Sequence, residues 1–434
     1  MLSPYLSEYD ESTSSEGSLD PLGLYPISDQ LATKLVPGFR ERMRHPRYLT
    51  TIAAGMVICS EFDEDIAASD DRTEPWQIYE WYAVHALYAK YRTDDETQLI
   101  GLPGIDKAKK AYNANISLNP SSYLKMATVF GFHGVYRTLA KDLKLIDTNI
   151  LGEFGDELIR TWEKEENLEG FYSSPFGSGR DLRKQFYNAI NDSLKTTSIA
   201  RNRNWNAFYE LAEHIAPYKI NPIERKLLYN KIIGEIDSYR YQVIKTIELS
   251  EVQKIWNDTG SEKEIHKILF SSATNDLKHL LKAIFQYEEF ARLLQDAFDS
   301  CLYVMSGRSS TRINDLKNNT EITKAGKKVS DSYKKAIDAI SEYGLSFQFE
   351  ERFSTFEKAV SVPDWINLLF EHHETTQKNK PPNGKRPWFE RTNDSRFLIY
   401  PGNRRDESPT GEDLYVHYYR TTPLVSFLKD LGKI

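Results

Sequence analysis

The sequence predicts a mainly α-helical protein with a winged-helix-like module and a small, irregular C-terminal segment that contains short strands. Three observations support this fold class. Apolar residues recur at helical spacing through most of the chain. Residues 119–165 form three helical segments separated by a turn and a break, which is the order expected of a winged helix. Several prolines between 381 and 423 exclude long helices near the C-terminus.

A length of 434 residues suggests two or three domains, each with its own core. Residues 1–20 are rich in Ser and acidic side chains, which bury too little surface to fold, so they predict a flexible tail. Changes in composition divide the rest into four segments. These are an N-terminal helical domain at 21–118, the winged-helix-like module at 119–170, a long-helix domain at 171–330, and a helical and extended segment at 331–434.

Helix starts are marked most clearly in the first hundred residues. Ser28 is predicted to cap a helix that Pro37-Gly38 ends. Pro46 and Pro75 each occupy a position that opens a helix rich in aromatic residues. The acidic residues at 61–71 predict a solvated loop between these two helices.

The second half of the chain is predicted to be helical until its last part. The expected elements are a long helical region at 181–305, a polar surface connection at 306–330, helices near 332–343 and 363–373, and short strands in FLIYP and LYVHYYR.

The segment GVYRTLAKDLKLID, residues 134–147, is the candidate recognition helix. Val135, Leu139 and Leu143 repeat every four residues and are expected to face the core. A final amphipathic helix follows in LGEFGDELIRTW, as winged-helix modules commonly have. The stretch between these two helices is short for a full two-stranded wing.

Arg137, Lys141 and Lys144 stand at i, i+4 and i+7 of this segment and would share one outward stripe, with Thr138 beside it. Such a stripe suits contact with phosphates and base edges in a major groove, so these four residues are the principal candidates for DNA binding. Two alternatives remain open: a helical hairpin with a solvated basic face, and a winged helix that binds proteins.

Two further basic segments are auxiliary candidates. Arg42 and Arg44 lie in RERMRHPR, where charge alone would attract phosphate. Pairing of the arginines of this run, Arg47 among them, with the acidic loop at 61–71 is the favoured alternative, because its carboxylates follow closely in the sequence. Lys385 and Arg386 lie in the extended run KNKPPNGKRPWFER, which predicts either a phosphate-facing loop or a loop that docks another subunit.

No motif identifies an enzyme. The chain has no GxxxxGK[ST], GxSxG or GxGxxG pattern. His372 and His373 are adjacent, so they lack the i, i+4 spacing of a helical zinc site. Glu163, Glu165 and Glu166 are interpreted as a solvated helix face. We therefore assign no catalytic residue, cofactor or metal.

Cysteine content and charge indicate the cellular environment and the kind of partner that fit this chain. Cys59 and Cys301 show no CxxC spacing, so a disulfide scaffold is not expected and a reducing cytoplasm fits. No signal peptide or membrane-spanning run is evident. Nine Asp and nine Glu against two Lys and six Arg give the first 100 residues a net charge of −10, so the remainder carries +3. A local basic face is compatible with this distribution.

The run LGLYPISDQLATKLVPGFRERMRHPRYLT resembles helical subunits encoded in bacterial phage-defence islands. PPNGKRPWFER and the late HYYRT…SFLKDL are also similar to proteins of that neighbourhood. The features that carry the resemblance are structural: Leu22-Gly23, Ile27, Ala32, Leu35, Pro37-Gly38 and Arg47-Tyr48. The resemblance implies a subunit that works beside ATPases, methyltransferases or nucleases, and it supplies no active-site residue.

The leading hypothesis is therefore a non-catalytic subunit of a multi-protein antiphage system that contacts DNA or acts as a scaffold. A second hypothesis is a protein–protein adapter that docks partners through the aromatic helices at 76–91 and 205–218. A third is a nuclease whose active site is assembled from residues distant in sequence.

Overall fold

The structure is a computed structural model that describes residues 20–63, 65–93, 99–148, 150–200, 205–381, 383–409 and 414–434. This part of the chain is mainly helical, with two small two-stranded sheets, as the sequence predicts. Its contacts form two compact units. Unit 1 combines the chain before Val36 with Ser250–Tyr419, and unit 2 combines Val36–Leu249 with Arg420–Ile434.

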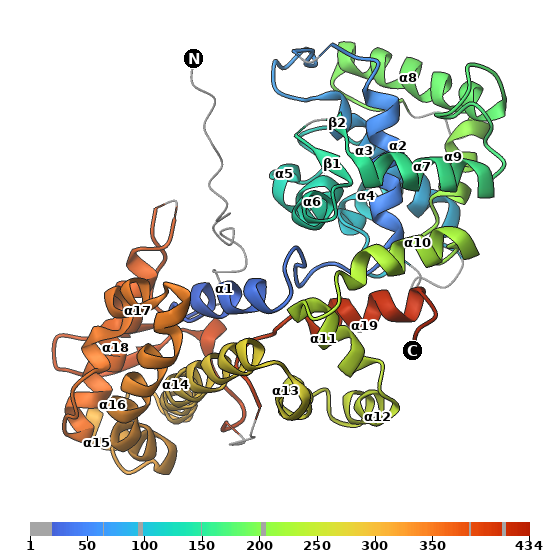
Figure 1. The fold of residues 1–434 in the computed structure, drawn as a ribbon. Helices are drawn as coiled ribbons and strands as arrows, with labels where there is room; N and C mark the ends of the chain where they lie inside the picture. The colour runs from blue at the N-terminus through green and yellow to red at the C-terminus, as the bar shows by residue number, and fades with distance from the viewer. Residues whose placement is uncertain are drawn as a thin grey trace. The chain divides into compact units, whose positions relative to one another are not determined.

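Among the residues described, unit 2 contains ten helices between Arg47 and Ile247, a β-hairpin and the C-terminal helix (Figure 1). In order these are α2 (Arg47–Cys59), α3 (Pro75–Tyr91), α4 (Ile105–Asn113), α5 (Ala127–Phe130), α6 (Phe132–Asp142), β1 (Ile146–Asp147), β2 (Ile150–Leu151), α7 (Glu153–Glu165), α8 (Ser178–Thr196), α9 (Asn206–His214), α10 (Pro222–Ile233), α11 (Tyr239–Ile247) and α19 (Thr421–Asp430).

Unit 1 is built around one long helix, α14. Its elements are α1 (Tyr25–Leu35), α12 (Ser250–Thr259), α13 (Glu262–Ser272), α14 (Asn275–Ser306), α15 (Ile313–Leu316), α16 (Thr320–Ile340), η2 (Ser341–Tyr343), α17 (Ser346–Phe353), η3 (Ser354–Phe356), α18 (Val362–Lys378), β3 (Phe389–Arg391), β4 (Phe397–Ile399) and η4 (Pro401–Asn403).

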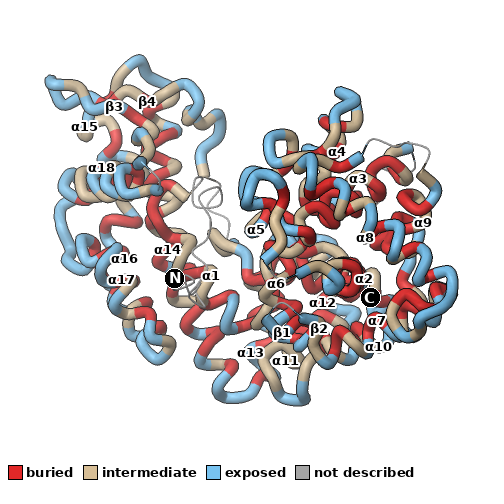
Figure 2. The backbone as a smooth tube through the Cα atoms, turned by 90° about the horizontal axis from the view of Figure 1, so that it is seen from above, coloured by how far each residue is buried: buried red, intermediate tan, exposed pale blue. Residues whose placement is uncertain are grey.

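Helix α3 is the central helix of unit 2. Pro75 is its first residue, and the side chains of Glu74 and Gln77 cap its first turn reciprocally. Most of its aromatic residues are buried, because α3 packs against α2, α4, α8 and α9 (Figure 2). Helix α2 likewise begins directly after Pro46. The predicted starts of both helices are confirmed.

The candidate recognition helix is shorter than predicted. Val135, Leu139 and Leu143 are buried as expected, but α6 ends at Asp142 in a Schellman motif. The amide of Leu145 donates to the Ala140 carbonyl over 2.8 Å, and Lys144 has a left-handed φ of 57°. The prediction that Lys144 continues the helical stripe is therefore wrong.

A short hairpin, β1–β2, connects α6 to α7. Ile146 pairs with Leu151 and Asp147 with Ile150, so each strand has only two residues. Gly152 and Phe154 then donate backbone hydrogen bonds to Leu145 and Lys144 and tie the start of α7 to the end of α6.

In unit 1, α14 packs lengthwise against α16. The prediction of a surface connection at 306–330 is wrong in its second half, because α16 begins at Thr320. The Asn319 side chain accepts the amides of Glu321 and Ile322 and caps this helix. The polar residues that suggested a connection lie on the outer face of α16, while Ile322 and Val329 are buried.

Only one of the two predicted C-terminal strands forms. β4 lies within FLIYP and pairs antiparallel with β3, with Phe397 opposite Arg391. The described part of LYVHYYR is not a strand. Its backbone instead donates to buried carboxylates: Val416 to Glu288 and Tyr419 to Glu262. These side-chain acceptors replace the neighbouring strand that a sheet would require.

The start of α1 also differs from the prediction. Asp20, rather than Ser28, satisfies the first amides: its carboxylate accepts from Leu24 and Tyr25. Ser28 lies inside the helix, where its hydroxyl donates to the Tyr25 carbonyl. The predicted flexible tail falls outside the described residues, apart from Asp20.

The two units do not coincide with the five segments expected from composition. The helices at both ends of the chain belong to a different unit from the residues next to them in sequence. Helix α1 packs on α14 in unit 1, and α19 belongs to unit 2. Among the described residues, no helix is long and apolar enough to cross a membrane.

Candidate nucleic-acid interface

The basic residues of α6 differ in exposure. Lys141 is exposed on the helix, and Lys144 is exposed just beyond its end. Neither forms an ion pair with a carboxylate of the described chain. Arg137 is half-buried, and its Nε is buried without a hydrogen-bond partner in that same part of the protein. The two lysines thus present unpaired charge, while Arg137 is partly enclosed.

Thr138 connects α6 to the loop at 36–46. Its hydroxyl donates to the Gly38 carbonyl over 3.0 Å and accepts from Arg40 Nε at 3.3 Å. The hydroxyl proton is therefore already used within the protein. This geometry gives Thr138 an anchoring role beside the basic residues.

The same loop follows the flank of α6. The Tyr136 hydroxyl accepts the backbone amides of Arg44 and His45 over 3.0 and 3.2 Å. Gly38 lies directly against Leu139 and Asp142. The structure thus brings together two basic segments that are separated by about a hundred residues of sequence.

Arg42 and Arg44 behave differently in this loop. The exposed guanidinium of Arg42 lies 4.7 Å from the centroid of the Phe130 ring, a distance typical of a cation–π contact. Arg44 is half-buried, and its Nη1 donates to the carbonyls of Glu41 and Met43. Arg44 therefore stabilises the loop, and Arg42 is the more exposed of the two side chains.

Asp142, the acidic residue next to Lys141 in the sequence, is paired with a different cation. Asp142, at the end of α6, forms an ion pair of 2.5 Å with Arg240, which also donates to the Pro37 carbonyl. Asp142 is therefore engaged by α11 and does not cap Lys141.

Lys385 and Arg386 lie in unit 1, in the loop before β3. Lys385 is half-buried, and its amide donates to the Gln377 carbonyl. The guanidinium of exposed Arg386 stacks 3.9 Å from the Tyr400 ring centroid. They therefore belong to a different unit from the α6 surface.

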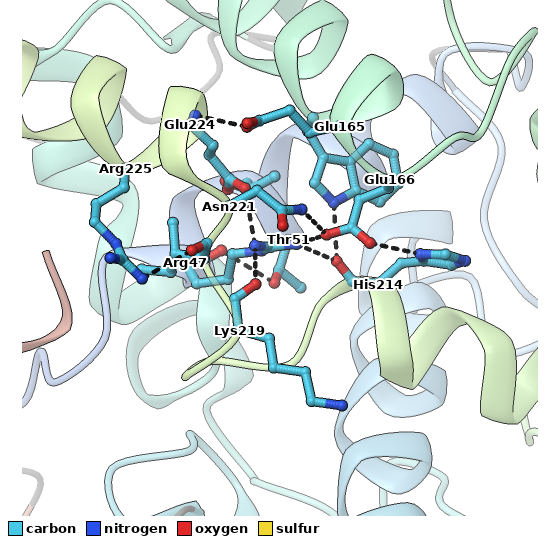
Figure 3. A network of polar contacts seen from close by, with 12 residues as sticks. Arg47, Thr51, Glu165, Glu166, His214, Lys219, Asn221, Glu224 and Arg225 are labelled. Carbon is cyan, nitrogen blue, oxygen red and sulfur yellow. Dashed lines mark hydrogen bonds and ion pairs between the residues drawn. The ribbon is translucent and has the colours of Figure 1, made fainter.

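Arg47, from the same basic run as Arg42, is completely buried in unit 2 (Figure 3). Its Nη2 lies 2.6 Å from Glu166, and its Nη1 lies 2.8 Å from Glu224. It also donates to the carbonyls of His214 and Lys219. Pairing with the acidic loop at 61–71 is therefore wrong for Arg47, because its partners come from the chain after α7 and from α10.

The three glutamates predicted to form a solvated face serve structural roles instead. Glu163 is buried and accepts the amides of Gly170 and Ser173. Glu165 accepts the first amides of α10, and Glu166 binds Arg47, His214 and Asn221. The sequence could not reveal these roles, because most of the partners lie about 50 to 120 residues away.

The pKa values of the two carboxylates that bind Arg47 are shifted in opposite directions. Burial raises the pKa of Glu224 to about 7 even though the Arg47 charge opposes it. Burial also acts to raise the pKa of Glu166, but hydrogen bonding from His214 and the Arg47 charge outweigh it and leave the pKa below its usual value. This network holds α2, α7 and α10 together and leaves Arg47 inaccessible to a ligand.

A cavity of about 240 Å³ lies in unit 2 beside the start of α6. It is lined by α2 and the loop after it, by α3, by the first residues of α6 and by Ile150 of β2. Nothing in the sequence predicted this cavity as a site. Its one local signal is Gly55 in the middle of α2, where the absence of a side chain admits the ring of Tyr79.

Two findings bear on the alternative functions, which are docking of partners through aromatic helices and nuclease activity. The aromatic residues of α3 that were considered for docking, such as Trp81 and Tyr82, are buried, and Trp205 packs on Tyr82 and Phe186. No cluster of three or more His, Cys, Asp or Glu side chains suitable for a metal occurs within the described ranges.

No protein-family model, curated protein or solved structure matches this chain.

Proposed function

We propose that this protein is a non-catalytic subunit of a bacterial antiphage complex and that unit 2 contacts nucleic acid through Arg42, Lys141 and Lys144, with Arg137 behind them. One observation carries the proposal: the loop at 36–46 and α6 hold basic side chains from two distant segments on neighbouring surfaces. In this proposal α6 acts as the recognition helix and the β1–β2 hairpin as a short wing.

The nature of the side chains supports contact with phosphates. Lys141 and Lys144 are exposed and have no carboxylate partner among the residues described, so binding an anion would not require breaking an ion pair. Their charge would release counterions from DNA, which makes affinity depend on salt. Sequence-independent binding of this kind suits a scaffold that holds other subunits on DNA.

The test is a comparison of two double charge reversals. Lys141→Glu with Lys144→Glu should weaken binding of a duplex at low salt by at least about tenfold and reduce the slope of log K against log salt by roughly 0.9 for each lost contact. The matched control is Lys164→Glu with Lys184→Glu, which changes two exposed lysines on α7 and α8 of the same unit.

The control should retain wild-type binding even though its net charge changes equally. An equal loss of duplex affinity in both variants would mean that overall charge alone explains the effect, and would reject the α6 surface as the binding site. Unchanged binding in both folded variants would also reject it and leave an assembly role.

A further inference from the structure

The cavity beside α6 has walls that suit a flat ring. Its lining includes the rings of Trp76, Tyr79, Phe132 and His133, together with the flexible side chain of Met56. The Trp76 and His133 rings lie 4.6 Å apart between centroids, at an interplanar angle of 32°. Aromatic faces of this kind hold nucleobases by stacking, with little dependence on base identity.

Polar groups accompany these apolar walls. No described residue forms a hydrogen bond with the ring nitrogens of His133, while Ser60, Asp63 and Glu74 are exposed lining residues. Burial, reinforced by the charges of Arg137 and Lys141, lowers the pKa of His133 to about 4. The imidazole is therefore neutral near pH 7 and offers one donor and one acceptor to a ligand.

Cationic side chains continue from the cavity along α6. His133, Arg137 and Lys141 are spaced four residues apart, so they follow one another on one helix face. Arg137 is next to His133 in this series, and its buried Nε has no partner among the described residues. An anionic group attached to a ring in the cavity would meet these two cations.

We propose that the cavity binds a single nucleobase, with the phosphate attached to it held by Arg137 and Lys141. A volume of about 240 Å³ is below the roughly 300–1,000 Å³ of pockets for drug-sized ligands, which favours one base over a dinucleotide. The base comes either from a free nucleotide or from the end of a nucleic-acid strand. This inference rests on the proposed function, because both use the cations of α6.

The experiment uses the full chain and two kinds of probe. The four nucleoside 5′-monophosphates are titrated by calorimetry, and a single strand with 2-aminopurine at its 5′ end is followed by fluorescence. Met56→Trp fills the cavity, and Ile236→Trp adds the same side chain at a position of unit 2 that is 76% exposed.

At least one probe should bind the wild-type protein. Met56→Trp should weaken that binding by at least tenfold, and Ile236→Trp should leave it unchanged. Binding of the monophosphates identifies a free nucleotide as the source of the base. Quenching of 2-aminopurine without monophosphate binding identifies a strand end.

The inference is overturned if no monophosphate binds at millimolar concentration and the 2-aminopurine emission of the wild-type complex stays unquenched. This readout needs no variant, so it holds even if Met56→Trp fails to fold. Duplex binding that depends on Lys141 and Lys144, together with an empty cavity, rejects this inference alone. Monophosphate binding without duplex binding rejects the proposed function alone.

Discussion

Arg47 places a permanent positive charge in the interior of unit 2, where an unpaired ion would be strongly destabilising. Two carboxylates and two backbone carbonyls surround it. The cost of removing these groups from water offsets much of the attraction between them, so the network specifies one arrangement of α2, α7 and α10 more than it adds stability. Removing one member should therefore cost far more than the net value of the pair.

Replacing Arg47 with Met is expected to lower the free energy of unfolding by about 3–5 kcal/mol, because Glu166 and Glu224 lose their shared cation. The matched control is Arg160→Met. Arg160 forms an ion pair with Asp156 at the surface, where such pairs contribute little to stability. Urea denaturation of both variants measures the difference, and equal losses would show that Arg47 is no more important than a surface residue.

At the scale of elements, the contact between α2 and α3 depends on a glycine, Gly55, which has no side chain to obstruct the ring of Tyr79. A Cβ at Gly55 would lie 2.3 Å from a ring carbon of Tyr79. The Tyr79 hydroxyl donates to the Thr51 carbonyl over 2.9 Å, which fixes that ring against α2. The same contact forms one wall of the cavity.

Gly55→Ala therefore sets two effects against each other. Alanine favours the helix by about 1 kcal/mol, while overpacking of a core costs about 1–3 kcal/mol. Because the clash is with a fixed ring, we expect net destabilisation and a lower melting temperature. Gly402→Ala is the control, since a Cβ there meets nothing within 4 Å. A melting temperature that rises with Gly55→Ala would mean that the two helices can separate freely.

At the scale of the whole molecule, local sequence signals predicted individual helices, whereas contacts between distant residues determine how these helices are grouped into two units. Pro46 and Pro75 marked helix starts correctly because their effect is confined to the adjacent turn. The end of α6 and the start of α16 were missed, since a Schellman motif without glycine and a polar outer face give little signal. Neither the Arg47 network nor the cavity could be predicted from the sequence, because their residues come from several distant segments.

Helix α19 shows how far such grouping extends. Phe427 is buried in unit 2, with its ring 5.1 Å from Phe39 and 6.4 Å from Tyr136 between centroids. Asp430 bonds to His45 over 2.6 Å, and Ser426 donates to the Arg44 carbonyl. The last helix therefore supports the loop that carries Arg42, and the proposed interface depends on the C-terminal end of the chain.

Phe427→Ala should remove about 3–5 kcal/mol from the stability of unit 2, as expected for a buried phenylalanine. Hydrogen exchange should then accelerate in α2 and α6, while the amides of α14 and α16 keep their protection because unit 1 has its own core. Phe176→Ala, at a 74% exposed position of unit 2, is the control and should change stability by less than about 0.5 kcal/mol. Accelerated exchange throughout the chain after Phe427→Ala would mean that the two units unfold as one, and that α19 stabilises more than the unit in which it is packed.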